Sequence, residues 1–276
     1  MNDGLLHRVA DRFQRLAGRS RLLVRLAVLV RNQARCVIKY HLAESPDVGE
    51  TGEGWVRELA MPDARRVVDV GANVGDWLGG ALAHARGGVA AIACEPSSSA
   101  LVRLRARFAG DPRVRIVEAA FGDRDGEMTF LEEADAGRGS TLVPGLGRLE
   151  GIPRTVTVTT LASLFARAGW DGADLVKIDA EGFDARVIRG AYDLLHAQRI
   201  GVVQFEYNRS WQMAAQTLCG VYRLFEECGY RVFLLKREGL YQLDYARYEE
   251  YFEYSNFLAI APAWMPRFAS RERGVI

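Results

Sequence analysis

The stretch that decides the fold is Leu175-Val176-Lys177-Ile178-Asp179-Ala180-Glu181-Gly182, in which three charged residues stand where an apolar strand runs into a helix. A buried charge is costly unless it is paired, hydrogen-bonded or close to an opening. In open α/β sheets, ligands bind at the carboxyl ends of the parallel strands. Asp179 and Glu181 are therefore the first candidates for chemistry.

The segments around this stretch alternate short β-branched runs with helical patterns, which is typical of βαβ units. Seven main strands are predicted, at residues 67–70, 89–94, 114–119, 175–178, 200–207, 230–235 and 257–261. Helices are predicted at residues 75–85, 100–108, 161–168, 183–196 and 213–228. The predicted fold class is α/β, with a Rossmann-like, seven-stranded, mostly parallel sheet, helices on both faces, one antiparallel strand and additional N-terminal helices.

The region between the third and fourth main strands predicts an insertion. Residues 127–131 continue as an added hairpin strand, residues 155–159 are strand-like, and the glycine-rich residues 134–153 predict a surface loop near the pocket.

The N-terminal segment differs from the rest in charge. Residues 1–40 carry nine Lys and Arg against two Asp, a net charge of +7, whereas the remainder carries −6. We therefore predict a basic helical segment at residues 1–52 and a catalytic domain at 53–276. We consider three roles for this segment. It packs on the catalytic domain as a helix, covers the substrate pocket as a lid, or attaches the protein to an anionic membrane surface. The apolar run at 22–30 is interrupted by Arg25 and is too short to span a membrane.

The composition restricts the class of protein. The chain has 276 residues, 49% of them hydrophobic, which is enough for a full core. Its four cysteines show no CxxC spacing, which indicates reduced thiols in a cytoplasmic protein. Basic residues are not interleaved with aromatic ones, which disfavours a nucleic-acid partner. The sequence does not specify an oligomeric state.

The turn Asp69-Val70-Gly71-Ala72-Asn73-Val74-Gly75 joins the first strand to the first helix, where glycines let a ligand approach the backbone. A dinucleotide fingerprint starting at Gly71 requires glycine where this chain has Asn73 and Asp76. Asp76 would also repel a pyrophosphate. Glu95 ends the second strand, where it can accept hydrogen bonds from a ribose diol. Together these features indicate an adenosine compound without phosphates, for which S-adenosylmethionine is the obvious candidate.

Three motifs carry a resemblance to a known family: Val68-Asp69-Val70-Gly71-Ala72-Asn73-Val74-Gly75, then Glu95-Pro96, and Val176-Lys177-Ile178-Asp179-Ala180-Glu181-Gly182 followed by Gly190-Ala191. With them the chain resembles the FkbM family of class I S-adenosylmethionine-dependent methyltransferases over roughly residues 53–262. It departs from the family pattern at Ala162, where Asp is common. Members typically methylate hydroxyls of sugars, polyketides or related metabolites.

The resemblance implies a set of cofactor-binding residues, with the glycine turn around the methionine moiety, Glu95 at the ribose and residues 120–123 near the adenine. The residues expected at the cofactor are Asp69, Gly71, Ala72, Asn73, Gly75, Glu95, Pro96, Ala120, Phe121, Asp123 and Asp179.

Methyl transfer to an alcohol needs a base in the pocket. No His stands at a predicted strand end, so carboxylates are the candidates, and we assign catalytic roles to Asp179, Glu181 and Glu206. Strand alternation puts Lys177 and Asp179 on one face. We expect Lys177 to pair with Glu206, which would leave Asp179 facing the substrate as the base.

Two alternatives use the same region. Asp179, Glu206 and Asn208 could bind Mg²⁺, which prefers oxygen ligands, but the expected pairing of Glu206 with Lys177 disfavours this site. Tyr207 and Trp211 either line an acceptor pocket or pack at the sheet edge. The sequence thus predicts an O-methyltransferase acting on a small molecule or glycan. The alternatives are a cofactor-binding protein without activity and a methyltransferase acting on nitrogen.

Overall fold

The computed structural model describes residues 11–42, 51–132, 141–143 and 152–276. The chain divides into two compact units, Met1–Ala43 and Glu44–Ile276. Most of the loop predicted at 134–153 and the first turns of the basic N-terminal helix lie outside the described residues. The assignment of separate roles to residues 1–52 and 53–276 stays a prediction.

The N-terminal unit contains the 22-residue helix α2 (Arg21–Leu42), which is basic in its last turn through Lys39 and His41. Within the described part of the chain, no helix combines the length and the apolar character needed to cross a membrane.

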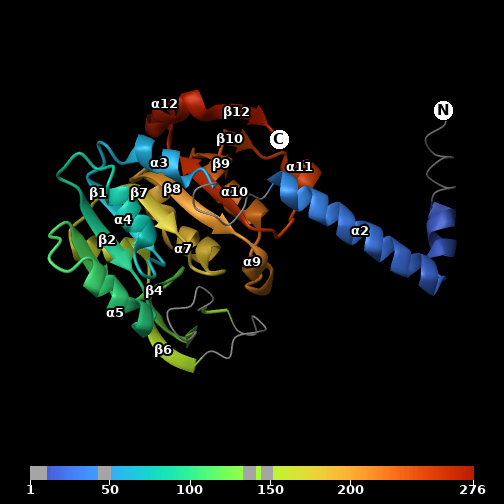
Figure 1. The fold of residues 1–276 in the computed structure, drawn as a ribbon, viewed down its shortest axis with the longest axis horizontal. Coiled ribbons are helices and arrows are strands. Elements are labelled where there is room, and N and C mark those ends of the chain that lie inside the picture. Colours follow the sequence, from blue (N-terminus) through green and yellow to red (C-terminus); the bar gives the residue numbers. More distant parts are fainter. Residues whose placement is uncertain (1–10, 43–50, 133–140, 144–151) are drawn as a thin grey trace. The chain divides into compact units, whose positions relative to one another are not determined.

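The larger unit is built on a nine-stranded sheet in the order β12-β10-β9-β11-β8-β7-β1-β2-β3 (Figure 1). Its strands are β1 (Arg66–Val70), β2 (Ala90–Cys94), β3 (Val114–Val117), β7 (Ala173–Ile178), β8 (Ile200–Tyr207), β9 (Arg231–Lys236), β10 (Gly239–Gln242), β11 (Ser255–Ile260) and β12 (Glu272–Val275). Strands β3, β2, β1, β7 and β8 are parallel neighbours, and β11 runs antiparallel to β8 and β9.

The predicted fold class is confirmed, and the seven predicted main strands form a continuous part of the sheet from β9 to β3. The expected strand number is wrong, because β10 and β12 extend the edge beyond β9. Both have four residues, and most of β12 is exposed, so neither produces a buried apolar run in the sequence.

A second sheet has the order β4-β6-β5, with strands β4 (Ala120–Phe121), β5 (Gly126–Glu132) and β6 (Ile152–Thr159). It contains both strands predicted in the insertion. A small apolar cluster joins this sheet to the start of α7, formed by Ala120, Phe130, Leu142, Val143, Val158 and Phe183.

The helices of the larger unit are α3 (Glu53–Ala60), α4 (Asp76–Leu82), α5 (Ser98–Arg107), α6 (Leu161–Ala168), α7 (Asp184–Gly190), α8 (Tyr192–His196), α9 (Arg209–Met213), α10 (Leu218–Glu227), α11 (Tyr245–Tyr248) and α12 (Met265–Phe268). The single helices predicted at 183–196 and 213–228 are wrong in extent. The first is divided into α7 and α8, and the second begins only at Leu218, where Thr217 supplies the N-cap.

One face of the sheet carries the site. Val67, Leu175 and Val202 point to this face and share a buried cluster with Val56 of α3 and Leu78 of α4. Because side chains alternate along a strand, the residues two positions further along β1, β7 and β8 lie on this same face. These residues are Asp69, Lys177 and Gln204, which are polar and stand near the carboxyl ends of the strands.

Candidate active site

A cavity of about 560 Å³ opens at the carboxyl ends of β1, β2, β7 and β8. Ten of the residues predicted for the site line it: Gly71, Ala72, Asn73, Glu95, Pro96, Ala120, Phe121, Asp179, Glu181 and Glu206. Four predicted residues are not among the lining residues, namely Asp69, Gly75, Asp123 and Asn208. One cavity therefore joins the glycine turn to the carboxylates of the strand ends.

The glycine turn is shaped by the neighbouring strand as well as by the cavity. Gly71 has a φ of +77°, and a Cβ there would lie 1.8 Å from the carbonyl oxygen of Asp179. The backbone N–H groups of Gly71 and Ala72 both donate to the carbonyl of Cys94, at 3.0 and 2.9 Å. The turn thus fixes the ends of β1, β2 and β7 relative to one another, and only glycine fits at position 71.

Gly75 serves packing outside the cavity. It has a φ of +84°, and a Cβ there would lie 2.5 Å from the ring of Phe108 at the end of α5. Gly75, which was predicted to touch the cofactor, therefore allows α5 to pack closely against the turn.

Glu95 is held rigidly at one side of the cavity. Its Oε2 accepts a hydrogen bond from the backbone N–H of Asn73 at 2.7 Å, and its Oε1 accepts one from that of Ser97 at 2.7 Å. The side chain is 6% exposed. Burial raises the pKa of Glu95 to about 7, although the hydrogen bonds from Ser97 and Asn73 oppose the increase. Each carboxylate oxygen keeps a second lone pair for a ligand.

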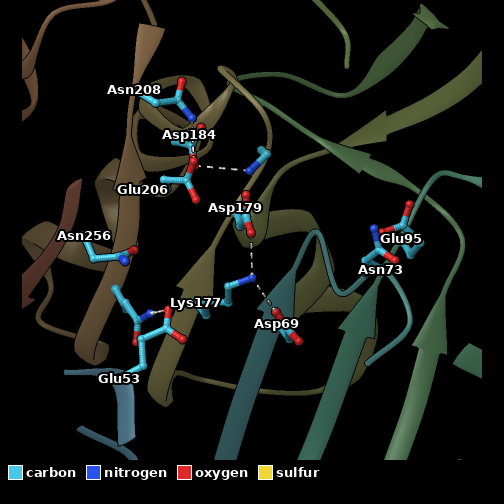
Figure 2. Close-up of polar contacts among 12 residues, drawn as sticks. Glu53, Asp69, Asn73, Glu95, Lys177, Asp179, Asp184, Glu206, Asn208 and Asn256 are labelled. Atoms are coloured by element: carbon cyan, nitrogen blue, oxygen red, sulfur yellow. Dashed lines mark hydrogen bonds and ion pairs between the residues drawn. The ribbon is translucent and has the colours of Figure 1, made fainter. Parts of the chain in front are cut away.

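Two rows of polar side chains cross the other side of the cavity. The strand register places Asp69 of β1 opposite Lys177 of β7, and Lys177 opposite Gln204 of β8. In the next row, Glu206 of β8 is opposite Asn256 of β11. Figure 2 shows Asp179 lying between the Glu95 side and the Glu206 side.

Lys177 is the cation at the centre of these rows. Its Nζ lies 3.0 Å from Oδ2 of Asp179 and 3.7 Å from Oδ1 of Asp69. Burial opposes its charge, but Asp179, Asp69 and Glu53 outweigh burial and raise the pKa of Lys177. The expected pairing of Lys177 with Glu206 is wrong, because Asp69 stands directly opposite Lys177 on β1.

Asp69 lies behind the cavity wall rather than in it. The side chain is fully buried, and neither carboxylate oxygen has a hydrogen-bond partner, since 3.7 Å to Lys177 is too long for one. Burial raises the pKa of Asp69 to about 6, and Lys177 limits the increase. Asp69, which was predicted to contact the cofactor, therefore acts on the site through Lys177.

The loop after β7 is fixed by a residue that sequence reasoning missed. Asp184 at the start of α7 is buried and accepts hydrogen bonds from the backbone N–H groups of Ala180 (3.2 Å) and Gly182 (3.1 Å). Burial and the charge of Asp179 raise the pKa of Asp184 to about 7. Glu181 takes a left-handed φ of +46°, and its carbonyl accepts from Thr141 at 2.7 Å. A carboxylate in a helix's first turn was the available signal for Asp184.

Glu206 lies at the end of the cavity away from Glu95. Its Oε1 accepts a hydrogen bond from Nδ2 of Asn208 at 2.5 Å, while Oδ1 of Asn208 accepts from the backbone N–H of Ser210 and caps α9. Burial raises the pKa of Glu206 well above its usual value, and the charges of Asp179, Glu181 and Asp184 raise it further.

The magnesium alternative finds no support in this geometry. Asn208 is not among the cavity-lining residues, and its amide oxygen is bonded to the N-terminus of α9. Among the described residues, no group of three or more His, Cys, Asp or Glu is arranged to hold a metal ion.

The end of the cavity around Glu206, called the acceptor end from here on, includes three further residues that sequence reasoning missed, Glu53, Gln204 and Asn256. Glu53 of α3 accepts a 2.7 Å hydrogen bond from Nε2 of Gln204, and Nδ2 of Asn256 donates to the Tyr254 hydroxyl at 3.2 Å. All four line the cavity. Gln204 was detectable, because Gln204 and Glu206 repeat on β8 the alternation of Lys177 and Asp179.

The aromatic residues after β8 belong to the core. Tyr207 and Trp211 are fully buried, with Trp211 stacked on Phe205 at 6.1 Å between ring centroids. The Tyr207 hydroxyl donates to Glu250 at 2.9 Å. Of the two alternatives for these residues, the structure supports packing rather than an acceptor surface, although β8 lies inside the sheet, between β11 and β7, and not at its edge.

Comparison with known proteins gives one family match. The Methyltransferase FkbM domain family matches residues 69–232, more than half of the chain. No curated protein matches the sequence.

Several solved structures are similar at low identity. A methyltransferase FkbM from Methylobacillus flagellatus is 13% identical with a TM-score of 0.45, and the match covers 71% of this chain and 44% of that one. A precorrin-6y C5,15-methyltransferase from Geobacter metallireducens is 14% identical with a TM-score of 0.41, covering 75% and 87%. An O-methyltransferase from Bacillus cereus in complex with SAH is 11% identical with a TM-score of 0.39, covering 83% and 87%.

Proposed function

The chain belongs to the FkbM methyltransferase family, and from this premise we propose that its cavity binds S-adenosylmethionine and directs methyl transfer to a hydroxyl of a sugar, a polyketide or a related small metabolite. One observation carries the proposal. A single cavity has the rigidly held Glu95 and the glycine turn on one side and the Lys177-bound Asp179 on the other.

The residues of the cavity fit this cofactor. Glu95 offers carboxylate lone pairs to a ribose diol, and the turn at Gly71 brings backbone close to the ligand. Asp76 in the first turn of α4 makes the same helix N-terminus unfavourable for a pyrophosphate. Acidic residues outnumber basic ones in the cavity wall, which favours a cationic ligand. When bound, the cofactor would supply an electrophilic methyl group on a sulfonium.

Asp179 is the residue that we assign to the acceptor. Its Oδ2 is held by Nζ of Lys177 at 3.0 Å, so Oδ1 is the oxygen that accepts the hydroxyl proton as the oxygen attacks. The ion pair with Lys177 fixes the side chain, and Lys177 is in turn fixed by Asp69 at 3.7 Å. Asp184 holds the loop that follows. Because the site holds the acceptor hydroxyl and the base in a fixed orientation, the two groups do not have to meet by diffusion in water. This lowers the entropic part of the activation barrier.

The test has two stages. Isothermal titration calorimetry with S-adenosylmethionine and with S-adenosylhomocysteine measures cofactor binding, and we expect both to bind wild type. Formation of S-adenosylhomocysteine with hydroxylated acceptors, followed by mass spectrometry of the product, measures transfer. Failure of wild type to bind either compound would overturn the proposal. Binding without transfer to any acceptor would support the non-catalytic alternative.

A further inference from the structure

The acceptor end of the cavity, formed by Glu53, Gln204, Glu206, Tyr254 and Asn256, contains a buried oxygen that accepts no hydrogen bond from the protein. Gln204 is 1% exposed, its Nε2 is used on Glu53, and its Oε1 is buried without a hydrogen-bond partner. Asn256 likewise donates a hydrogen bond from Nδ2 to the Tyr254 hydroxyl, so Oδ1 is the side-chain atom of Asn256 that can accept one. A buried acceptor without a donor is unfavourable, so this end of the cavity is suited to a ligand that brings donors.

The charge at the acceptor end points to one kind of donor. Lys177 is bound to Asp179 and Asp69, and Arg57 offsets the charge of Glu53. Glu206 differs from these carboxylates, because the largest charge effects on it come from Asp179, Glu181 and Asp184, all of them acidic. A cation from the ligand would supply the countercharge that Glu206 does not receive from these neighbours.

We propose that Glu206, with Gln204 and Asn256 beside it, binds an ammonium group of the acceptor, so that the substrate is an amino alcohol such as an amino sugar or an aminocyclitol. The proposal rests on the proposed function and specifies its substrate class. It is carried by the buried, donor-less oxygen of Gln204 and by the position of Glu206 at the far end of the same cavity.

The arrangement also determines which atom receives the methyl group. Glu206 stands on β8 and Asp179 follows β7, and adjacent strands are about 4.8 Å apart. The hydroxyl at Asp179 and the ammonium at Glu206 therefore belong to nearby carbons of one small molecule. A protonated amine has no lone pair for attack, so the nitrogen is held as a cation while the hydroxyl oxygen forms the new bond to carbon and passes its proton to Asp179.

Matched acceptors test the proposal directly. We would compare D-glucosamine with N-acetyl-D-glucosamine and D-glucose, and 2-deoxystreptamine with scyllo-inositol, measuring kcat/KM and the methylated position. Since hydrogen bonds to charged groups are among the strongest in proteins, we expect the amines to be preferred by about tenfold to a hundredfold. Equal or better transfer to the neutral acceptors, methylation on nitrogen, or no binding and no transfer with the amines would overturn the proposal.

A variant and a matched control locate the effect. Glu206→Gln should lower kcat/KM for the amines about tenfold to a hundredfold and reduce their preference over the neutral acceptors to near one. Glu58→Gln, on the exposed side of α3, should change neither value. A Glu206→Gln enzyme that keeps the wild-type preference would contradict the assignment. S-adenosylmethionine affinity, measured on both variants, tests the fold and the proposed cofactor binding separately from the acceptor preference.

Proton release gives a readout that needs no variant. Burial and the acidic neighbours raise the pKa of Glu206, and an ammonium bound beside it should lower that pKa again, so binding of 2-deoxystreptamine to the S-adenosylhomocysteine complex should release protons. Calorimetry in phosphate and in MOPS measures this release from the difference in observed enthalpy. Binding with equal enthalpies in both buffers would overturn the role of Glu206.

Discussion

The two ends of the cavity are built in different ways. The cofactor end consists of backbone groups at the ends of β1 and β2, together with Glu95, whose two oxygens are fixed by backbone N–H donors. The acceptor end consists of side chains from α3, β8 and β11 that bond to one another, as in the contact of Gln204 with Glu53. A backbone-built site changes little when side chains change, whereas a side-chain site can be altered one residue at a time.

The family match falls on these two ends unequally. Residues 69–232 include the whole glycine turn, Glu95 and Asp179, but Glu53, Tyr254 and Asn256 lie outside them. The shared chemistry is therefore located in the matched segment. On the proposed assignment, recognition of the acceptor therefore draws partly on segments outside the family match.

The largest effect should come from Asp179, which stands between the two ends. Asp179→Asn keeps the shape and the backbone contact with Gly71 but removes the base, so we expect kcat to fall by about 10³-fold or more. S-adenosylmethionine affinity should stay within about threefold of wild type, because the cofactor end is unchanged. Single-turnover formation of S-adenosylhomocysteine measures the rate, and calorimetry measures the affinity. An active Asp179→Asn enzyme would remove the assignment of the base.

The next effect concerns the backbone that connects the ends. Gly71→Ala places a Cβ against the Asp179 carbonyl at 1.8 Å and strains a φ of +77°, so we expect a loss of about 3 kcal/mol in the free energy of unfolding. Gly88→Ala is the matched control, because Gly88 has a similar φ of +69° but open space around it, and it should cost about 1 kcal/mol. Urea unfolding measures both variants. Equal losses would show that the close approach to Asp179 is unimportant.

A smaller effect is confined to the cofactor end. Glu95→Gln should weaken S-adenosylmethionine binding by about tenfold to a hundredfold, because a charge-assisted hydrogen bond is replaced by a neutral one. Since the ionised carboxylate accepts ribose hydroxyls and the pKa of Glu95 is about 7, wild-type affinity should decrease as the pH falls below 7. The variant should lose this pH dependence.

Calorimetry between pH 5.5 and 8.5 tests the behaviour of Glu95. Glu118→Gln is the control, because Glu118 is an exposed carboxylate that pairs with Arg105 at 2.7 Å away from the cavity lining. It should behave like wild type at every pH. A wild-type affinity that is constant over this range would contradict the role of Glu95.

The cofactor end could be predicted from the sequence because its elements are local. The turn at Gly71 and the carboxylate at Glu95 each follow a short buried strand, so a parallel sheet brings them together without knowledge of distant contacts. The seven main strands were predictable for the same reason. Strands β10 and β12 were not, since neither forms a buried apolar run of its own.

The acceptor end depends on information that the sequence does not contain. Lys177 has acidic residues on both neighbouring strands, and only the register shows that Asp69 rather than Glu206 is its partner. Glu53 meets Gln204 from 151 positions away in the chain, through the packing of α3 on the sheet. Such contacts are set by tertiary packing, which no local pattern records.

The smallest effect concerns the side chain of Ser97, a cavity-lining residue that caps α5. Ser97 caps α5 by accepting from the N–H of Ala100 at 3.2 Å, and its hydroxyl donates to Glu132 at 2.8 Å. Ser97→Ala should reduce the free energy of unfolding by about 1 kcal/mol, the usual value of an N-cap. Because Glu95 is held by the backbone N–H of Ser97, which the substitution keeps, S-adenosylmethionine affinity should fall no more than about threefold. Thr217→Ala, which uncaps α10 away from the cavity, should cost similar stability and leave the affinity unchanged. A large loss of affinity in Ser97→Ala alone would show that the cofactor end depends on side chains as much as the acceptor end does.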